Sequence, residues 1–192
     1  MSLDKEGVYY HTTKVYSFIF KPEVKGSTKY FLGLLNSKVL WFFLTQTGYV
    51  LRGGYYTFKT DYLKPFPIPD SSITQQKVIE TFVDYLLYLK ALPAAKIVNS
   101  SRHPLIISFF EQLIDGVVYE LYFPESFKDA EVNLSELLIK ENLQSIEQCN
   151  DDVVTSICNL FERIYIPEHP VRKSLFFLDT IEAVRVVEEH AK

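Results

Sequence analysis

The side chains best suited to chemistry gather between residues 47 and 59, around a pair of glycines. Hydrogen-bond donors, positive charges and aromatic faces alternate there, at Thr47, Arg52, Tyr55, Tyr56 and Lys59. Arginine and lysine suit both phosphates and guanine edges, and tyrosine can contact a backbone or stack on a base. The segment is therefore a candidate nucleic-acid contact. The alternative is that its tyrosine pair only packs beside a hairpin.

The center of this segment, Arg52-Gly53-Gly54, has the composition of a tight hairpin-like turn between two β-forming runs. Two successive glycines can adopt positive φ, or let the backbone approach a groove or a phosphate closely. Arg52 would then project at the tip, where a bidentate contact to guanine or a phosphate clamp is open to it. An ordinary hairpin with an exposed arginine is the alternative.

Catalytic motifs are missing from the sequence. Arg52-Gly53-Gly54 lacks both the third glycine of a dinucleotide turn and the Gly-Lys-Ser/Thr of a phosphate loop. No Cys-x-x-Cys or His-x-x-x-His spacing occurs, and the four histidines are isolated. Pro69-Asp70 could open a nuclease motif, but no Glu-x-Lys or Asp-x-Lys follows it in a strand. We therefore expect no catalytic residue and no metal site.

Charge is distributed unevenly along the 192 residues, whose net charge is −4. Residues 1–70 carry nine Lys/Arg against five Asp/Glu, whereas residues 71–192 carry eleven against nineteen. Such asymmetry hints at a nucleic-acid-facing part, although a local lysine excess is also ordinary solvated surface. We expect one positive face, formed by Lys14, Lys21, Lys25, Lys29, Lys38, Arg52, Lys59 and Lys64.

Composition places the chain among globular proteins. An apolar fraction of 47% is enough to bury a core, and two cysteines cannot form a disulfide framework. No apolar run approaches the ~20 residues of a membrane span, and no signal peptide opens the chain, so we expect a cytoplasmic protein without membrane contact. Met1-Ser2-Leu3 stands apart from the pattern that follows, which suggests a fragment of a longer protein.

The predicted fold class is α+β, with a small α/β unit at residues 1–70 and a helical unit at 71–192. Alternating apolar residues predict a strand at 13–20, and three- and four-residue apolar spacing predicts a helix at 28–45. Three prolines between residues 65 and 69 predict an extended run. Beyond Asp70 the pattern is helical throughout, with helices expected at 75–92, 104–121, 134–148, 151–164 and 179–190.

Several stretches in this order resemble a known family. They are Tyr30-Phe31-Leu32-Gly33-Leu34-Leu35-Asn36-Ser37-Lys38, Arg52-Gly53-Gly54, Leu63-Lys64-Pro65-Phe66-Pro67-Ile68-Pro69 and, farther on, residues 109–123. Together they resemble the TaqI-like C-terminal specificity domain of type II (notably type IIG) restriction-modification enzymes and adenine-specific DNA methyltransferases. The arrangement is also similar to the specificity subunits of type I systems.

The resemblance implies that the chain recognises a sequence in double-stranded DNA and catalyses nothing itself. A parent enzyme would supply the catalytic domains, with S-adenosylmethionine and magnesium as their cofactors, and this fragment would hold none. Together with the residue chemistry above, the resemblance predicts that DNA is bound by Lys38, Thr47, Arg52, Gly53, Gly54, Tyr55, Lys59 and Lys64.

Two further hypotheses belong to other classes. The acidic, helical residues 71–192 could form a protein-interaction or scaffolding domain that does not bind DNA. A complete small enzyme is the third, and retention of a cofactor or metal would support it. Salt-dependent binding to duplex DNA separates the first hypothesis from the second.

Overall fold

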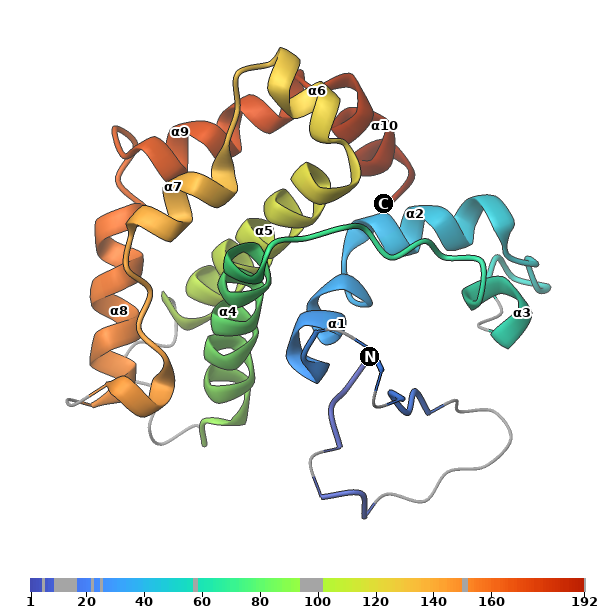
Figure 1. Ribbon diagram of the computed structural model, residues 1–192, viewed down its shortest axis with the longest axis horizontal. Coiled ribbons are helices and arrows are strands. Elements are labelled where there is room, and N and C mark those ends of the chain that lie inside the picture. The colour runs from blue at the N-terminus through green and yellow to red at the C-terminus, as the bar shows by residue number, and fades with distance from the viewer. Residues whose placement is uncertain are drawn as a thin grey trace.

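The computed structural model describes residues 1–4, 6–8, 17–21, 23–24, 26–56, 59–93, 102–149 and 152–191. Within these ranges the chain folds into helices joined by short connections (Figure 1). The helices are α1 (Thr28–Leu34), α2 (Lys38–Thr47), α3 (Thr60–Leu63), α4 (Ile73–Ala91), α5 (Arg102–Tyr122), α6 (Pro124–Asp129), α7 (Leu134–Lys140), η2 (Ile146–Gln148), α8 (Val153–Ile164), α9 (Pro170–Phe177), η3 (Leu178–Thr180) and α10 (Glu182–His190).

The predicted α+β class is wrong, because the protein is all-α. In the part of the chain that the structure describes, the β structure amounts to one isolated antiparallel bridge between Val50 and Tyr56. Of the strand expected at 13–20, residues 13–16 lie outside the described residues, and Ser17–Phe20 are not in a strand. Strands need partners for their backbone groups. Phe20 instead stacks on Phe31 of α1, with ring centroids 4.6 Å apart.

The single helix predicted for 28–45 is divided into α1 and α2. Ser37 causes the division, because its hydroxyl accepts a hydrogen bond from the Leu40 amide and so caps α2. The same hydroxyl donates to the carbonyl of Leu34 at 2.7 Å, which satisfies the end of α1. The apolar spacing continues across the break, so periodicity alone could not show it.

Helices α4 and α5 form the center of the molecule, and both were predicted from their apolar spacing. A capping box of Ser72 and Gln75 begins α4. The two helices pack through Phe82 and Phe110, whose ring centroids lie 5.2 Å apart. One cluster of buried side chains runs from Tyr30 on α1 to Val187 on α10. Residues 1–70 and 71–192 therefore share a core, and the boundary at residue 70 stays a prediction.

Two prolines begin helices in the C-terminal half. Pro124 and Pro170 occupy the first turns of α6 and α9, where a missing amide costs nothing. Both helices were missed, because the prolines indicated only helix breaks. The helix predicted for 134–148 ends at Lys140, and Asn142 follows with a φ of 52°. Those expected at 151–164 and 179–190 correspond to α8 and to η3 with α10.

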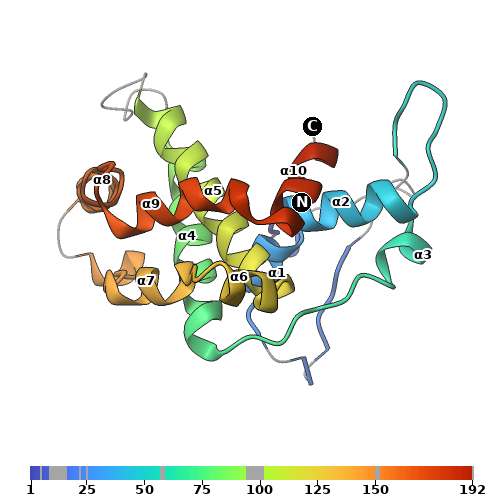
Figure 2. The same cartoon turned by 90° about the horizontal axis from the view of Figure 1, so that it is seen from above.

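One segment projects from the helical body. Helix α2 leads away from it, and the loop between α2 and α3 extends into solvent (Figure 2). We call residues 47–56 and 59–64 the arm. As for the membrane, none of the helices in the described ranges combines the length and apolar character needed to span one.

Candidate nucleic-acid interface

The arm is built around the predicted hairpin-like turn. The Leu51 amide donates to the Tyr55 carbonyl at 2.6 Å, and the Gly54 amide donates to the Leu51 carbonyl at 3.1 Å. Gly53 and Gly54 have φ values of 94° and 81°, in the region that favours glycine. The two glycines therefore close the turn that the sequence indicated.

Aromatic contacts fix the base of the arm to the helical body. The ring of Tyr56 meets Trp41 of α2 edge-on, with centroids 5.4 Å apart. After α3, residues 66–72 of the proline-rich run and its continuation form neither helix nor strand. Phe66 is buried, and its ring centroid lies 5.3 Å from that of Phe43 on α2. The Tyr122 hydroxyl of α5 donates to the Pro67 carbonyl at 2.7 Å. The arm is thus held at both ends while its tip is free.

The cations of the arm are exposed, and none of them has an acidic partner among the residues that the structure describes. Arg52 lies in the turn, and Lys59 and Lys64 flank α3. In the described ranges no carboxylate forms an ion pair with any of the three. The arm's one acidic residue is Asp61. Three unpaired positive charges on a projecting segment form a surface that attracts an anion such as a phosphate chain.

The other arm residues of the predicted set are accessible as well. Thr47 is exposed at the end of α2, where its hydroxyl donates to the Phe43 carbonyl at 2.8 Å and can still accept a bond. Tyr55 is 72% exposed. Seven of the eight predicted DNA-binding residues therefore lie on the arm, namely Thr47, Arg52, Gly53, Gly54, Tyr55, Lys59 and Lys64.

Lys38, the eighth, lies elsewhere. It begins α2, whereas Thr47 ends it, so the two residues are separated by about 14 Å of helix. Its ammonium group lies 2.6 and 2.8 Å from the carboxylate oxygens of Glu188 on α10. The charge of Lys38 is therefore compensated within the protein.

The wider positive face expected from the sequence is only partly present in the described residues. Lys29 forms an ion pair with Asp84 at 2.6 Å. Like Lys38, it therefore adds no free positive charge to this face. Lys21 is exposed in the N-terminal segment. Lys14 and Lys25 lie outside the described residues. Of the eight expected cations, the three that share one segment and have no acidic partner in the described residues are those of the arm.

A partly buried polar cluster, which we call the α2 anchor, fixes the start of α2 and was not predicted. It consists of Lys38, Asp115 and Tyr119 of α5, and Glu188. The Asp115 carboxylate accepts from the Lys38 backbone amide at 3.0 Å, and the Tyr119 hydroxyl donates to Glu188 at 2.8 Å. Burial raises the pKa of the Asp115 carboxyl to about 6 and also raises that of the Tyr119 hydroxyl.

The α2 anchor joins the arm to the C-terminal half of the chain. Its interactions connect α2 with α5 and α10, so the direction of α2, and with it the arm, depends on those helices. Asp115 and Tyr119 are one helical turn apart, inside an otherwise apolar stretch of α5. An acidic residue in such a stretch is the signal that could have revealed the cluster.

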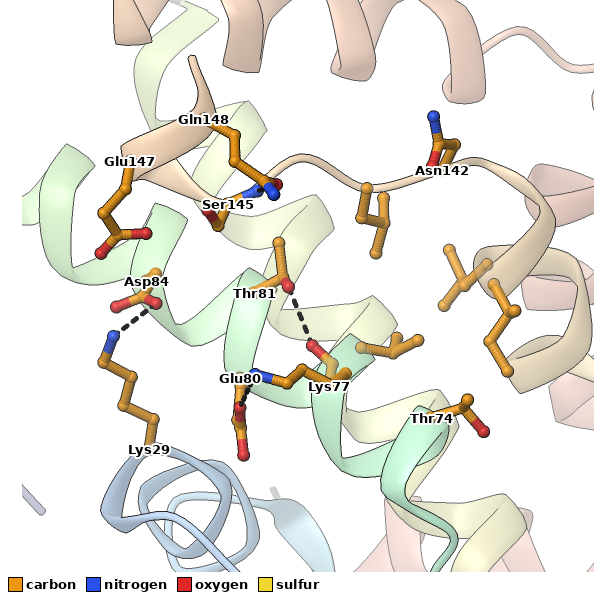
Figure 3. A pocket seen from close by; sticks show the side chains of 14 residues that line it. Lys29, Thr74, Lys77, Glu80, Thr81, Asp84, Asn142, Ser145, Glu147 and Gln148 are labelled. Atoms are coloured by element: carbon orange, nitrogen blue, oxygen red, sulfur yellow. Dashed lines mark hydrogen bonds and ion pairs between the residues drawn. The ribbon is translucent and has the colours of Figure 1, made fainter.

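A pocket of about 570 Å³ lies on another part of the protein, between α4 and the segment from α7 to η2 (Figure 3). Four of its charged side chains pair with one another, Lys29 with Asp84 and Lys77 with Glu80 at 3.3 Å. Throughout the described ranges, no group of three or more histidine, cysteine or acidic side chains is arranged to hold a metal. The arm remains the surface whose chemistry points to a ligand.

The N-terminal part of the chain is similar to a known protein family. Residues 1–68 match the family model of the TaqI-like C-terminal specificity domain. The match includes α1, α2, the turn and α3, and thus nearly the whole interface described above. No curated protein and no solved structure matches the chain.

Proposed function

We propose, from the TaqI-like C-terminal specificity domain in residues 1–68, that this chain is the DNA target-recognition part of a type II restriction-modification enzyme. A specificity domain is not itself a catalytic unit. In this proposal the chain binds double-stranded DNA and positions catalytic domains of a parent enzyme. S-adenosylmethionine and magnesium would act in those domains.

The arm is the observation that carries the proposal. Phosphate contacts give most protein–DNA complexes their affinity and fix the register of the protein on the duplex. Arg52, Lys59 and Lys64 supply three unpaired charges for such contacts, on a segment that stands clear of the acidic body. Arginine also matches the O6 and N7 acceptors of guanine. The arm can therefore both hold the backbone and reach a base edge.

The helical residues 71–192 would act as a platform for the arm. They supply Asp115, Tyr119 and Glu188 to the α2 anchor and Tyr122 to the base of the arm. Recognition requires side chains held by a rigid support. The acidic body would also disfavour DNA contacts away from the arm.

The test compares two charge-reversal variants of the full chain on duplex DNA over a range of salt concentrations. One variant combines Arg52→Glu, Lys59→Glu and Lys64→Glu. Its matched control combines Lys128→Glu, Lys173→Glu and Arg185→Glu, which changes the net charge equally at exposed residues of the body. The arm variant should lose most of its affinity, and the slope of log K against log salt should fall by about three. The control should change both quantities much less.

Equal losses in the two variants would mean that net charge, and not the arm, governs binding. If the wild-type chain shows no salt-dependent affinity for duplex DNA, the proposal is wrong. That result would favour the protein-interaction domain, for which the acidic charge of residues 71–192 is the supporting observation.

A further inference from the structure

Tyr55 has an unusual setting at the tip of the arm. A Cβ atom at Gly53 would lie 3.3 Å from Cε2 and 3.4 Å from Cδ2 of the Tyr55 ring, so the ring lies close over the glycine. Despite this contact, 72% of the surface of Tyr55 is exposed to solvent. Among the described aromatic side chains none contacts it, whereas neighbouring Tyr56 packs on Trp41. Tyr55 thus presents a supported ring that no other described ring stacks on.

The backbone around this ring is fixed. The hydrogen bond from Leu51 to Tyr55 and the bridge between Val50 and Tyr56 hold the two sides of the turn together. Gly53 leaves room for the ring, because any larger residue would both crowd it and be strained at a φ of 94°. A ring held in this way loses little conformational freedom when it binds.

The surroundings of Tyr55 identify the kind of partner that would cover it. Leu51, 47% exposed, adds an apolar side chain, and Arg52 adds a positive charge in the same turn. An apolar or aromatic tip with flanking cations is the arrangement that enters a DNA groove and contacts a base step while the cations hold phosphates. Carboxylates alone would pair with the cations but would offer no apolar surface to the ring and Leu51.

We propose that Tyr55 is a stacking platform for a nucleobase displaced from its neighbours in the bound duplex. This inference rests on the proposed function and adds to it a residue that acts on base stacking and not on the phosphate chain. Any base has a face that can stack on tyrosine, so the contact itself is tolerant of sequence. It would favour sites where a base step is easily opened.

The test uses two short duplexes that differ at one central position, which holds 2-aminopurine either in a matched pair or in a mismatch. A mismatched base is already partly unstacked, so the cost of displacing it is smaller. The wild-type chain should bind the mismatched duplex more tightly and quench its 2-aminopurine fluorescence. Tyr55→Ala should weaken binding to this duplex by about 5- to 150-fold and abolish the quenching. Tyr55→Phe should retain both.

Tyr49→Ala is the matched control, because Tyr49 is a tyrosine of the same arm, 62% exposed, outside the glycine turn. It should behave as the wild type does. If Tyr55→Ala and Tyr49→Ala both bind and quench like the wild type, or if the wild-type chain binds both duplexes without quenching, the stacking inference is wrong and the proposed function stands. If the wild-type chain binds neither duplex, both are wrong.

Discussion

Substitution of Arg52 can distinguish recognition of a base from binding of a phosphate. It is exposed at the tip of the arm and has no acidic partner in the described residues. If it reads a base, Arg52→Ala should cost the parent enzyme about 1–3 kcal/mol of specific binding, with much less effect on non-specific DNA. If it clamps a phosphate, both kinds of binding should weaken alike and the salt slope should fall by about one.

Binding titrations on specific and non-specific duplexes, each at several salt concentrations, give these numbers. The stability of the fold should change by no more than about 0.5 kcal/mol, since the substitution is exposed. Affinity that is unchanged on both duplexes would remove Arg52 from the interface, and Lys59 would become the next candidate.

Asp115 links stability to pH. Its carboxyl group has a pKa near 6 in the folded protein, because burial disfavours its charge, against an ordinary value of 3.8. The folded state thus binds the proton more tightly than the unfolded chain does. The contribution of Asp115 to the free energy of unfolding is therefore greatest below about pH 4 and declines as the pH rises to about 6.

Asp115→Asn should remove this decline, because the amide is neutral and its oxygen can still accept from the Lys38 backbone. The variant should be more stable than the wild type at neutral pH, by at most about 3 kcal/mol. Urea unfolding across this pH range measures the difference, with the exposed Asp129→Asn as control. Parallel pH profiles for Asp115→Asn and the wild type would contradict the prediction.

Among the elements, α1 and α4 approach each other more closely than ordinary side chains allow. A Cβ atom at Gly33 would lie 2.4 Å from Cγ2 of Ile79, which is fully buried. Gly33→Ala should therefore destabilise the protein by about 1–3 kcal/mol, even though alanine favours a helix by about 1 kcal/mol. Urea unfolding measures this loss.

A double-mutant cycle identifies the cause. Ile79→Ala removes the crowded methyl group, so adding Gly33→Ala to it should cost much less than adding Gly33→Ala to the wild type. Costs that simply add would show that the glycine is needed for some reason other than this contact.

For the molecule as a whole, the shared core predicts cooperative unfolding. Trp41, the only tryptophan, lies on α2 in residues 1–70, whereas most helical residues belong to 71–192. Tryptophan fluorescence should report the first segment, and far-ultraviolet circular dichroism mainly the second. We expect the two denaturation curves to coincide, since α2 packs on α5 and α10. A separate, earlier transition in fluorescence would support two independent units divided near residue 70.

The sequence by itself determined the features that depend on local chemistry. Apolar spacing located α4 and α5, Gly53 and Gly54 located the turn, and three prolines marked the stretch between α3 and α4 that is not helical. The residues of the arm also followed from local composition, because they are neighbours along the chain. The motifs between Tyr30 and Pro69 were sufficient to identify the family whose model matches residues 1–68.

Only the tertiary structure decided what depends on distant partners. The alternating apolar residues before α1 suggested a strand, but a strand forms only beside a second strand. Phe20 stacks on the ring of Phe31 instead. Lys38 and Lys29 looked like free cations until the fold brought Glu188 and Asp84 to them. A pattern along the chain specifies which face of an element is apolar, but the partner of a charge or a hydrogen-bonding edge is set by packing.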